Sequence, residues 1–330
     1  MAQPSEPLPS QSYNRDAQRD EAGGAVLVAA TEAEAAPRSI SSPMRDAWRR
    51  FRHNWAAMIS LIIILILIVM SIFAPLMHTS DPMASDFTDL NAFPSWHHWF
   101  GTDGLGRDTY SRLVYGMRVT FVVGIVGAAI TTILGMLLGV ISGYFGGIVD
   151  ALLARFTDLM FAFPSFILAL IIISFYGSWA NSLGMGGAGR VVLLVIVFAI
   201  VGWPGLMRFV RSLVLSMKEQ QFIEAARTVG TGSWAIMIRH LLPNTYGLVL
   251  VQASFIVIGF IGTEAVLSLL GLGVQAPNPD LGVMLSQGAS VLDLNYWEVL
   301  APAIVLAILI LTFTFLGDGV RDAVDPRTKG

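Results

Sequence analysis

The sequence predicts an all-α polytopic membrane protein with about six transmembrane helices, and three observations support this prediction. Hydrophobic residues account for 55% of the 330 residues and charged residues for only 13%, unlike a soluble globular protein; the mean hydropathy is +0.67. Several apolar stretches reach the roughly 20 residues that cross the hydrocarbon core of a bilayer. Basic residues gather in clusters beside some of these stretches, which indicates how the chain is oriented.

Six apolar stretches are long enough to span a membrane, and none of them contains an acidic or basic side chain. In chain order they are 54–80, 119–141, 159–176, 191–207, 241–263 and 299–317. Pro164 and Pro204 fall inside the third and fourth stretches, where we expect them to kink or break the helix. Glycines in the second stretch, among them Gly135 and Gly139, predict close contacts between helices.

Residues 1–43 differ in composition from the rest of the chain. They are rich in Ala, Glu, Ser, Pro and Gln and show no sustained apolar period, which predicts a disordered tail. No basic start is followed at once by an apolar core, so we expect the first span to be a retained anchor rather than a cleaved signal. Residues 44–330 then form the transmembrane domain.

The basic clusters fall on one side of the membrane if the number of spans is even. They precede the first span, occupy the loop between the fourth and fifth, and follow the last: Arg45, Arg49, Arg50, Arg52, Arg208, Arg211, Lys218, Arg227, Arg239, Arg321, Arg327 and Lys329. The excess of Lys and Arg in cytoplasmic loops places this side in the cytoplasm, together with both termini. The opposite loops contain Arg107, Arg112, Arg118 and Arg190, with Trp96, Trp99, Trp179 and Trp297 as interfacial anchors.

The polar segment 218–244, on the predicted cytoplasmic side, should form two short helices separated by a sharp break. Gly230 and Gly232 end the first helix where a left-handed or tightly turned backbone is easiest. Ser233 is a plausible N-cap of a second helix over 234–240, and Pro243 should end that helix. The segment suits docking into a groove of another protein.

Ala225 and Ala226 leave little side-chain bulk on one side of the first of these helices, where another protein surface could approach closely, and Glu224 and Arg227 flank them as charged contacts. This segment resembles the EAA loop of bacterial ABC importer permeases: EAA, a glycine six residues after Glu224, and an apolar stretch that closes on LLP. The resemblance implies a type I permease fold whose EAA coupling helix sits in a cleft of an ATPase subunit. The residues it assigns to this contact are Glu224, Ala225, Ala226, Arg227, Gly230, His240, Leu242 and Pro243. His240 stands where many importer families have an aliphatic residue, but RHLLPN resembles the peptide-importer branch.

A second segment, FGTDGLGRDTYSRLVYGMRVTF at 100–121, resembles the signature that precedes the second span in C-type subunits of dipeptide, oligopeptide and nickel importers. Its glycines and aspartates predict a tight turn, and its arginines an interfacial helix before the chain enters lipid. We expect structural roles for this signature and for two acids farther along: Gly101, Asp103, Gly106, Arg107, Asp108, Arg112, Arg118, Glu264 and Asp318. The His97-His98 pair beside it is expected to be a solvated loop feature rather than a metal site.

Glu264 follows an uninterrupted apolar run, so a substrate or ion role is open. We favour a helix restart after Gly262 and Thr263, with Glu264 in its first turn. Further on, Asp280-Leu281 stands where the family more commonly has Ser-Trp.

The resemblance implies a permease subunit in the bacterial cytoplasmic membrane that forms a path for di- and oligopeptides. Implied partners are a homologous B-type permease, two ABC ATPases, an extracytoplasmic solute-binding protein and membrane lipid. Nickel chelates, glutathione and oligosaccharides remain open as cargo. A secondary transporter driven by an ion gradient is the alternative of another class, and it requires paired ionisable groups near the middle of the membrane.

No catalytic residue, metal or cofactor is expected in this chain. Its two lysines, Lys218 and Lys329, do not follow the glycine of a Walker A loop, so ATP and Mg²⁺ are expected to bind to the partner ATPases. Cysteine is absent, which excludes disulfides and thiol chemistry. The formal net charge of −3 gives no reason to expect nucleic acid as a partner.

Overall fold

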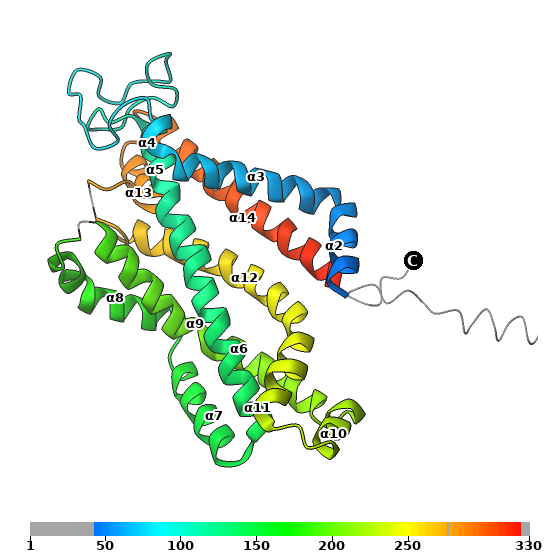
Figure 1. Cartoon of the computed structure of the whole chain (residues 1–330). Coiled ribbons are helices and arrows are strands. Elements are labelled where there is room, and N and C mark those ends of the chain that lie inside the picture. Colours follow the sequence, from blue (N-terminus) through cyan, green and yellow to red (C-terminus); the bar gives the residue numbers. More distant parts are fainter. Residues whose placement is uncertain (1–42, 186, 276, 325–330) are drawn as a thin grey trace, which may run out of the picture. The chain divides into compact units, whose positions relative to one another are not determined.

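The computed structural model describes residues 43–185, 187–275 and 277–324, and in these ranges the regular structure is helical except for one β-bridge between Thr102 and Asp108. The tail predicted at 1–43 therefore lies, apart from its last residue, outside the described residues, as do Arg327 and Lys329. The chain divides into two units, and the arrangement below is that of the second unit, which begins at Ala47 (Figure 1).

Six helical segments of the described residues are long and apolar enough to cross a membrane, as the sequence predicts. In chain order they are Trp55–Ile72, Thr109–Phe145, Ser165–Ser182, Gly187–Met217, Ser233–Leu269 and Trp297–Val324. Figure 1 shows the connection 78–108 and the short helix of the 218–244 segment at opposite ends of these spans, which fits a chain that crosses repeatedly.

The segments consist of the following elements: α3 (Trp55–Ile72), α5 (Thr109–Phe121), η1 (Val122–Val126), α6 (Gly127–Phe145), α8 (Ser165–Ser182), α9 (Gly187–Met217), α11 (Ser233–Ile236), η2 (Met237–Leu241), α12 (Leu242–Leu269) and α14 (Trp297–Val324). Shorter helices are α2 (Pro43–His53), α4 (Ala74–Met77), α7 (Gly147–Phe161), α10 (Gln221–Thr228) and α13 (Leu281–Ala289). The elements η1 and η2 are π-helical turns inside longer helices.

The second, fourth, fifth and sixth helical segments are longer than the predicted apolar stretches and do contain charged side chains. Arg112, Arg190, Glu264 and Glu298 all lie within them and are all buried. A charge inside a membrane helix is tolerated where it faces protein and finds a partner. Hydropathy alone locates the apolar centre of a span but not the partnered charges at its ends.

The interfacial helix expected to carry Arg112 and Arg118 does not form as a separate element. A helix starts at Thr109, capped by the Asp108 carboxylate, and continues through η1 into α6 as far as Phe145. No proline interrupts residues 109–145, so the peptide hydrogen bonds continue from the polar signature into the span.

The two prolines act differently. Pro164 is the N-cap residue of α8 and separates it from α7, so the expected break in the third stretch is confirmed there. Pro204 lies inside α9, which continues through it without ending. The helix tolerates the lost hydrogen bond because both Trp203 and Pro204 are buried against neighbouring elements.

The close contact between α6 and α9 depends on small residues, as the sequence predicts. A Cβ atom added at Gly139 would lie 2.7 Å from the Met207 carbonyl oxygen, and one at Gly135 would lie 2.8 Å from Leu206 Cβ. Glycine thus lets the two helix backbones approach closely in a setting where van der Waals packing drives helix association.

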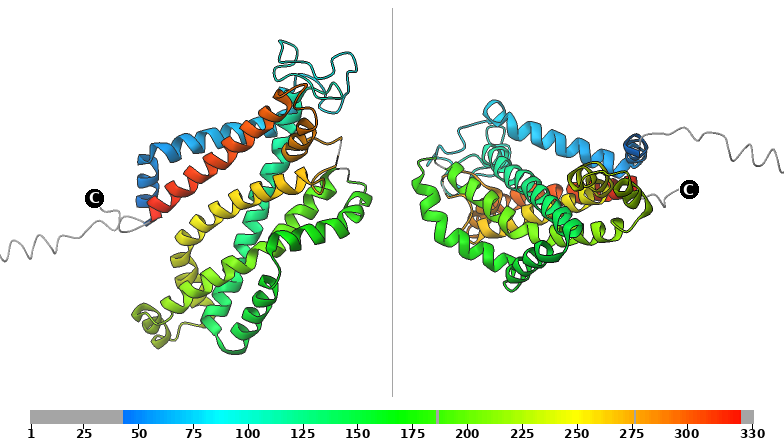
Figure 2. Two further views of the ribbon diagram at one scale, coloured as in Figure 1. Left: turned by 180° about the vertical axis from the view of Figure 1, so that it is seen from behind. Right: turned by 60° about the horizontal axis from the view of Figure 1, so that its bottom comes forward.

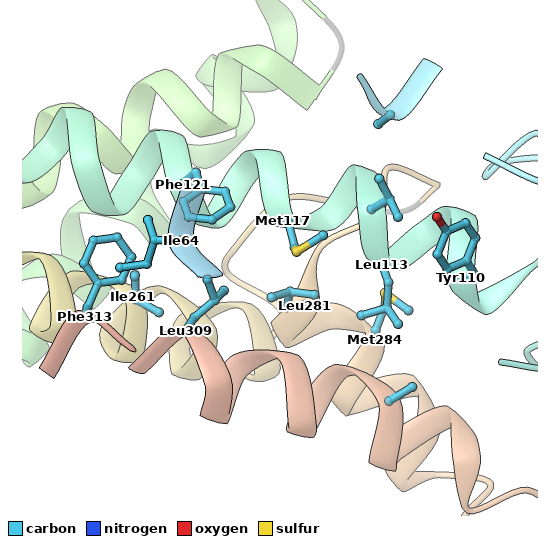
Figure 3. Close-up of a cluster of buried hydrophobic side chains, with 13 residues drawn as sticks. Ile64, Tyr110, Leu113, Met117, Phe121, Ile261, Leu281, Met284, Leu309 and Phe313 are labelled. Atoms are coloured by element: carbon cyan, nitrogen blue, oxygen red, sulfur yellow. The ribbon is translucent and has the colours of Figure 1, made fainter. Parts of the chain in front are cut away.

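A second contact is a cluster of buried side chains that joins α3, α5, α12, α13 and α14. Figure 3 shows members of this cluster gathered between α5 and α14, among them Met117, Leu281 and Leu309. Both views in Figure 2 show α3 lying along α14. This cluster and the α6–α9 contact pack together the spans that lead into the two polar segments, 100–121 and 218–244.

Candidate functional site: the 218–244 segment

The first helix of the segment, α10, ends in a turn that requires glycine. Gly230 has φ +81°, a left-handed conformation that other residues adopt only at a cost. The Gly230 N–H donates to the Arg227 carbonyl at 2.9 Å, and the Thr231 N–H donates to the Ala226 carbonyl at 3.0 Å. The break predicted at Gly230 is therefore confirmed.

The second helix differs from the prediction in both its start and its end. Gly232 is the N-cap residue, and Ser233 is already the first residue of α11, with no side-chain cap. Pro243 does not stop the helix, because α11, η2 and α12 run on continuously to Leu269. The π-helical turn makes this possible: the Leu242 N–H bonds to the Met237 carbonyl, and the proline falls where the bonding pattern changes.

The inner face of the segment packs onto the ends of two membrane helices. Ile223 and Ala226 of α10 are buried in one cluster with Val140 of α6 and with Val210 and Val214 of α9. Residues of α11 and η2 complete this cluster: Ile236, Met237 and Leu241. The buried side chains of α10 therefore belong to the same cluster as those of α6, α9, α11 and η2.

The outer face of α10 is formed by Phe222, Glu224, Ala225, Thr228 and Val229, all of which are exposed. At 3.6 residues per turn, Ala225 and Thr228 occupy its centre, Glu224 one edge, and Phe222 with Val229 the other edge. Val229 is 80% exposed. The face therefore combines an acidic edge, a centre without bulk and an apolar edge.

This geometry corrects the expectation that Ala225 and Ala226 leave space on the same side of the helix. Ala225 is exposed on the outer face, whereas Ala226 is buried on the inner face. The exposure of Phe222 and Val229 was not predicted from the sequence, because both residues are apolar. Successive residues of a helix point in different directions, and their spacing from the buried Ile223 was the signal that could have shown it.

The charged residues of the segment have different surroundings. The Arg227 guanidinium lies over the Tyr144 ring of α6, 5.5 Å from its centroid. Glu224 forms no ion pair with any described residue. His240 lies half-buried in η2, while Leu242 and Pro243 follow at the start of α12. Glu224 is thus available to a partner, whereas Arg227 is held against the membrane domain.

Two ion pairs fasten α7 to α9 near the segment. Arg211 binds Asp150 through two hydrogen bonds, one of them 2.6 Å from Nη2 to Oδ2, and Arg208 binds Asp158. The hydrogen bond from Arg211 lowers the pKa of the Asp150 carboxyl from its ordinary value of 3.8 to about 2. The partners are 61 and 50 positions apart along the chain, which is why the sequence did not reveal the pairs.

The signature at 100–121 lies at the other end of the spans and forms a buried polar network. Asp103 accepts hydrogen bonds from Arg107 Nε at 2.7 Å and from Arg112 Nη1 at 2.8 Å. Arg112 also donates to Gln287 Oε1 at 2.9 Å. Gly106 has φ +72°, and a Cβ atom there would lie 1.7 Å from the Asp86 carbonyl oxygen. The tight turn expected from the glycines is therefore present.

The remaining signature residues also make internal contacts. Asp108 caps α5, and its Oδ1 atom lies 2.8 Å from His98 Nδ1, at hydrogen-bonding distance. His98 is therefore not the solvated loop residue that was expected. Arg118 donates to the Ser71 carbonyl at 2.5 Å and to the Ile72 carbonyl at 2.8 Å. Gly101 has φ +74°, whereas Asp318 is exposed on α14, apart from this network.

Glu264 does not begin a helix. The helix α12 runs without interruption through Gly262 and Thr263, and Glu264 is fully buried in its last two turns. The helix restart was inferred from Gly262, which has a low helix propensity. Residues on either side of it, Ile261 and Ala265, are buried, and this packing stabilises the helix across Gly262.

Fold and site together define a multi-pass helical membrane protein that presents a helix–turn–helix at one end of its spans. The family described as binding-protein-dependent transport system inner membrane component matches residues 135–330. Residues 42–94 match the N-terminal TM domain of oligopeptide transport permease C.

Curated relatives match over most of the chain. The dipeptide transport system permease protein DppC of Bacillus subtilis is 34% identical over 90% of each chain, and DppC of Alkalihalophilus pseudofirmus is 40% identical over 87% of this chain and 91% of the relative. The glutathione transport system permease protein GsiD of Escherichia coli is 37% identical, over 89% of this chain and 94% of the relative. The chain therefore belongs to the family of inner-membrane permease components of binding-protein-dependent transporters, which confirms the resemblance inferred from its sequence.

Replacing Asp150 by Asn should destabilise the contact between α7 and α9 by about 1–3 kcal/mol, because the charge-assisted hydrogen bonds of Arg211 are lost. The folded pKa of Asp150 lies below the unfolded value, so its stabilisation is complete above about pH 4 and is lost as the pH falls through about 2. Denaturation of the detergent-solubilised chain measured against pH tests this. The more exposed Asp158→Asn variant should change stability less, and equal effects of the two variants would contradict the assignment.

Replacing Gly230 by Ala should loosen the end of α10, because a left-handed alanine costs roughly 1–2 kcal/mol. We expect trypsin to cleave after Arg227 about ten times faster in this variant, since local opening exposes the bond. Gly232 has φ −65° and open space around its Cα, so Gly232→Ala is the matched control and should leave the cleavage rate unchanged.

Proposed function

We propose that this chain is a C-type permease subunit of an ATP-driven ABC importer for di- and oligopeptides, and that the 218–244 segment couples it to an ATPase subunit. The observation that carries this proposal is the two-sided geometry of α10. Its inner face is packed onto α6 and α9, while its outer face is exposed and has no bulk at its centre. A surface of this kind suits insertion of a helix into a groove.

Coupling follows from the packing beneath α10. An ATPase that closes on ATP displaces the helix bound in its cleft, and Ile223 transmits that displacement to Val210 and Val214 of α9. The helix α9 is continuous from Met217 back to Gly187, so a displacement at one end reaches the other end as a rigid-body motion. Two such permease subunits would then change the access of the path between them.

The complete transporter in this proposal contains a homologous B-type permease, two ABC ATPases that bind ATP and Mg²⁺, and an extracytoplasmic solute-binding protein. Both termini and α10 face the cytoplasm. The support for this orientation is the position of the basic side chains, since Arg208, Arg211, Arg227 and Arg239 all lie at the α10 end. ATP hydrolysis takes place in the ATPase subunits and not in this chain.

Glutathione is the second candidate cargo, because relatives at 37% identity are named as glutathione permeases. Transport by the reconstituted assembly distinguishes the candidates: we expect di- and oligopeptides to raise the ATPase rate more than glutathione does. Uptake that continues without ATP and stops when ion gradients are dissipated would instead support a secondary transporter.

Replacing Ala225 by Trp places a large side chain at the centre of the outer face and should prevent close docking. An overpacked contact costs about 1–3 kcal/mol, so we expect about tenfold weaker retention of the ATPase during purification and a similar loss of solute-stimulated ATP hydrolysis. Ala151→Trp changes an exposed alanine on α7 and is the matched control. If both variants retain the ATPase equally, the outer face of α10 is not the docking surface.

A further inference from the structure

Two carboxyl groups meet in the protein interior where α12 packs against the start of α13. Glu264, near the end of α12, and Asp280, the N-cap residue of α13, are both completely buried. One oxygen of each group is used locally. Asp280 Oδ1 accepts from the Gly282 N–H at 2.8 Å and the Val283 N–H at 3.1 Å, and Glu264 Oε1 accepts from Ser268 Oγ at 2.8 Å.

The second oxygens, Glu264 Oε2 and Asp280 Oδ2, receive no hydrogen bond from any N–H or O–H of the described residues in normal geometry. The two side chains lie close together: Gly282, two residues after Asp280, packs on Ser268, where an added Cβ atom would lie 2.6 Å from Ser268 Cβ, and Ser268 donates to Glu264. Thr120 of α5, also completely buried, lies beside Glu264, and its hydroxyl is likewise without a partner of normal geometry. Three polar oxygens from three helices thus converge on one buried point.

Two ionised carboxylates cannot form this contact, because both groups are then acceptors only and their charges repel each other. Charged side chains on the elements packed around the pair have partners elsewhere. Arg112 of α5 and Glu298 of α14 belong to the Asp103 network, Arg118 binds the carbonyls of Ser71 and Ile72, and Arg190 of α9 donates to the Ile173 carbonyl. None of these cations forms an ion pair with Glu264 or Asp280 in the described part of the chain.

We propose that Glu264 and Asp280 together form a binding site for one proton, which joins the two carboxyl groups and fastens the start of α13 to α12. One carboxyl group keeps its proton and donates it to the other, which is ionised, so the pair carries a single negative charge. The Thr120 hydroxyl donates a further hydrogen bond to the pair. Serine would cap α13 as well as Asp280 does, so the helix start alone does not require the second carboxyl group.

The proton makes this contact dependent on pH. Burial raises the pKa of Asp280 above its ordinary value of 3.8. The folded pair therefore binds a proton that the unfolded chain has already released, and the stabilisation falls as the pH rises from the unfolded value towards the folded one. When the pH rises above the folded value, the second negative charge separates α13, which lies between the fifth and sixth spans, from α12. This inference does not depend on the cargo or on the ATPase.

Infrared spectroscopy of the full-length chain in its isolated assembly tests the proposal, because a protonated carboxyl group has a C=O stretch distinct from that of a carboxylate. We expect Glu264→Gln and Asp280→Asn each to remove one such band at neutral pH. Both variants supply an amide N–H in place of the shared proton, so both should fold. Asp293→Asn, an exposed carboxylate on the same side, should leave the band unchanged.

The same spectra contain the outcomes that overturn the proposal. A band that survives in one variant shows that the remaining carboxyl group holds its proton alone, and a band that survives in both variants shows that the proton lies elsewhere; either result overturns a shared proton. Loss of the band from the unmodified chain on addition of Na⁺ or Ca²⁺ at constant pH shows that the site binds a metal cation instead. Melting curves add a second measurement: between neutral and alkaline pH the unmodified chain should lose stability and Asp280→Asn should not, and parallel curves for the two proteins contradict a shared proton.

Discussion

The 218–244 segment is held to the spans by the burial of Ile223 and Ala226 in one cluster with the ends of α6 and α9. This burial fixes which face of α10 points inward, and so which face is exposed. The left-handed turn at Gly230 then returns the chain to α11 within a few residues, and α11 leads directly into a span. A helix held in this way can transmit force, because close-packed side chains do not yield gradually.

Two groups of charged side chains lie at the ends of the spans in contacts that satisfy them, as a low-dielectric environment demands. At one end of the spans Asp103 holds Arg107 and Arg112, and at the other Arg211 holds Asp150. Such ion pairs fix the relative positions of the helices but contribute little net stability, because the free energy of desolvating the charges offsets most of their attraction. The membrane domain therefore has a rigid polar connection at each end, with close helix packing between them.

Much of the fold could be predicted from the sequence, because apolar length and glycine positions act locally. The six spans, the turn at Gly230 and the close approach at Gly139 are all of this kind. The errors concern bonding patterns and contacts that local propensity does not reveal. Pro243 continues a helix because a π-helical turn precedes it, and Glu264 lies inside a helix that runs on through Gly262 and Thr263. The pairing of His98 with Asp108 arises only when the connection 78–108 folds back on the start of α5, and that of Arg211 with Asp150 only when α7 meets α9.

The most direct test of the central claim is cross-linking of the intact transporter through a single cysteine on the outer face of α10. The chain has no cysteine of its own, so a substitution at Ala225 introduces the only thiol of this subunit. The account predicts a cross-link to an ATP-hydrolysing subunit whose yield changes when ATP is added, while a cysteine at Ala226, on the buried inner face, gives none. Cross-linking of the Ala225 position only to lipid, or to no subunit at all, would contradict the account.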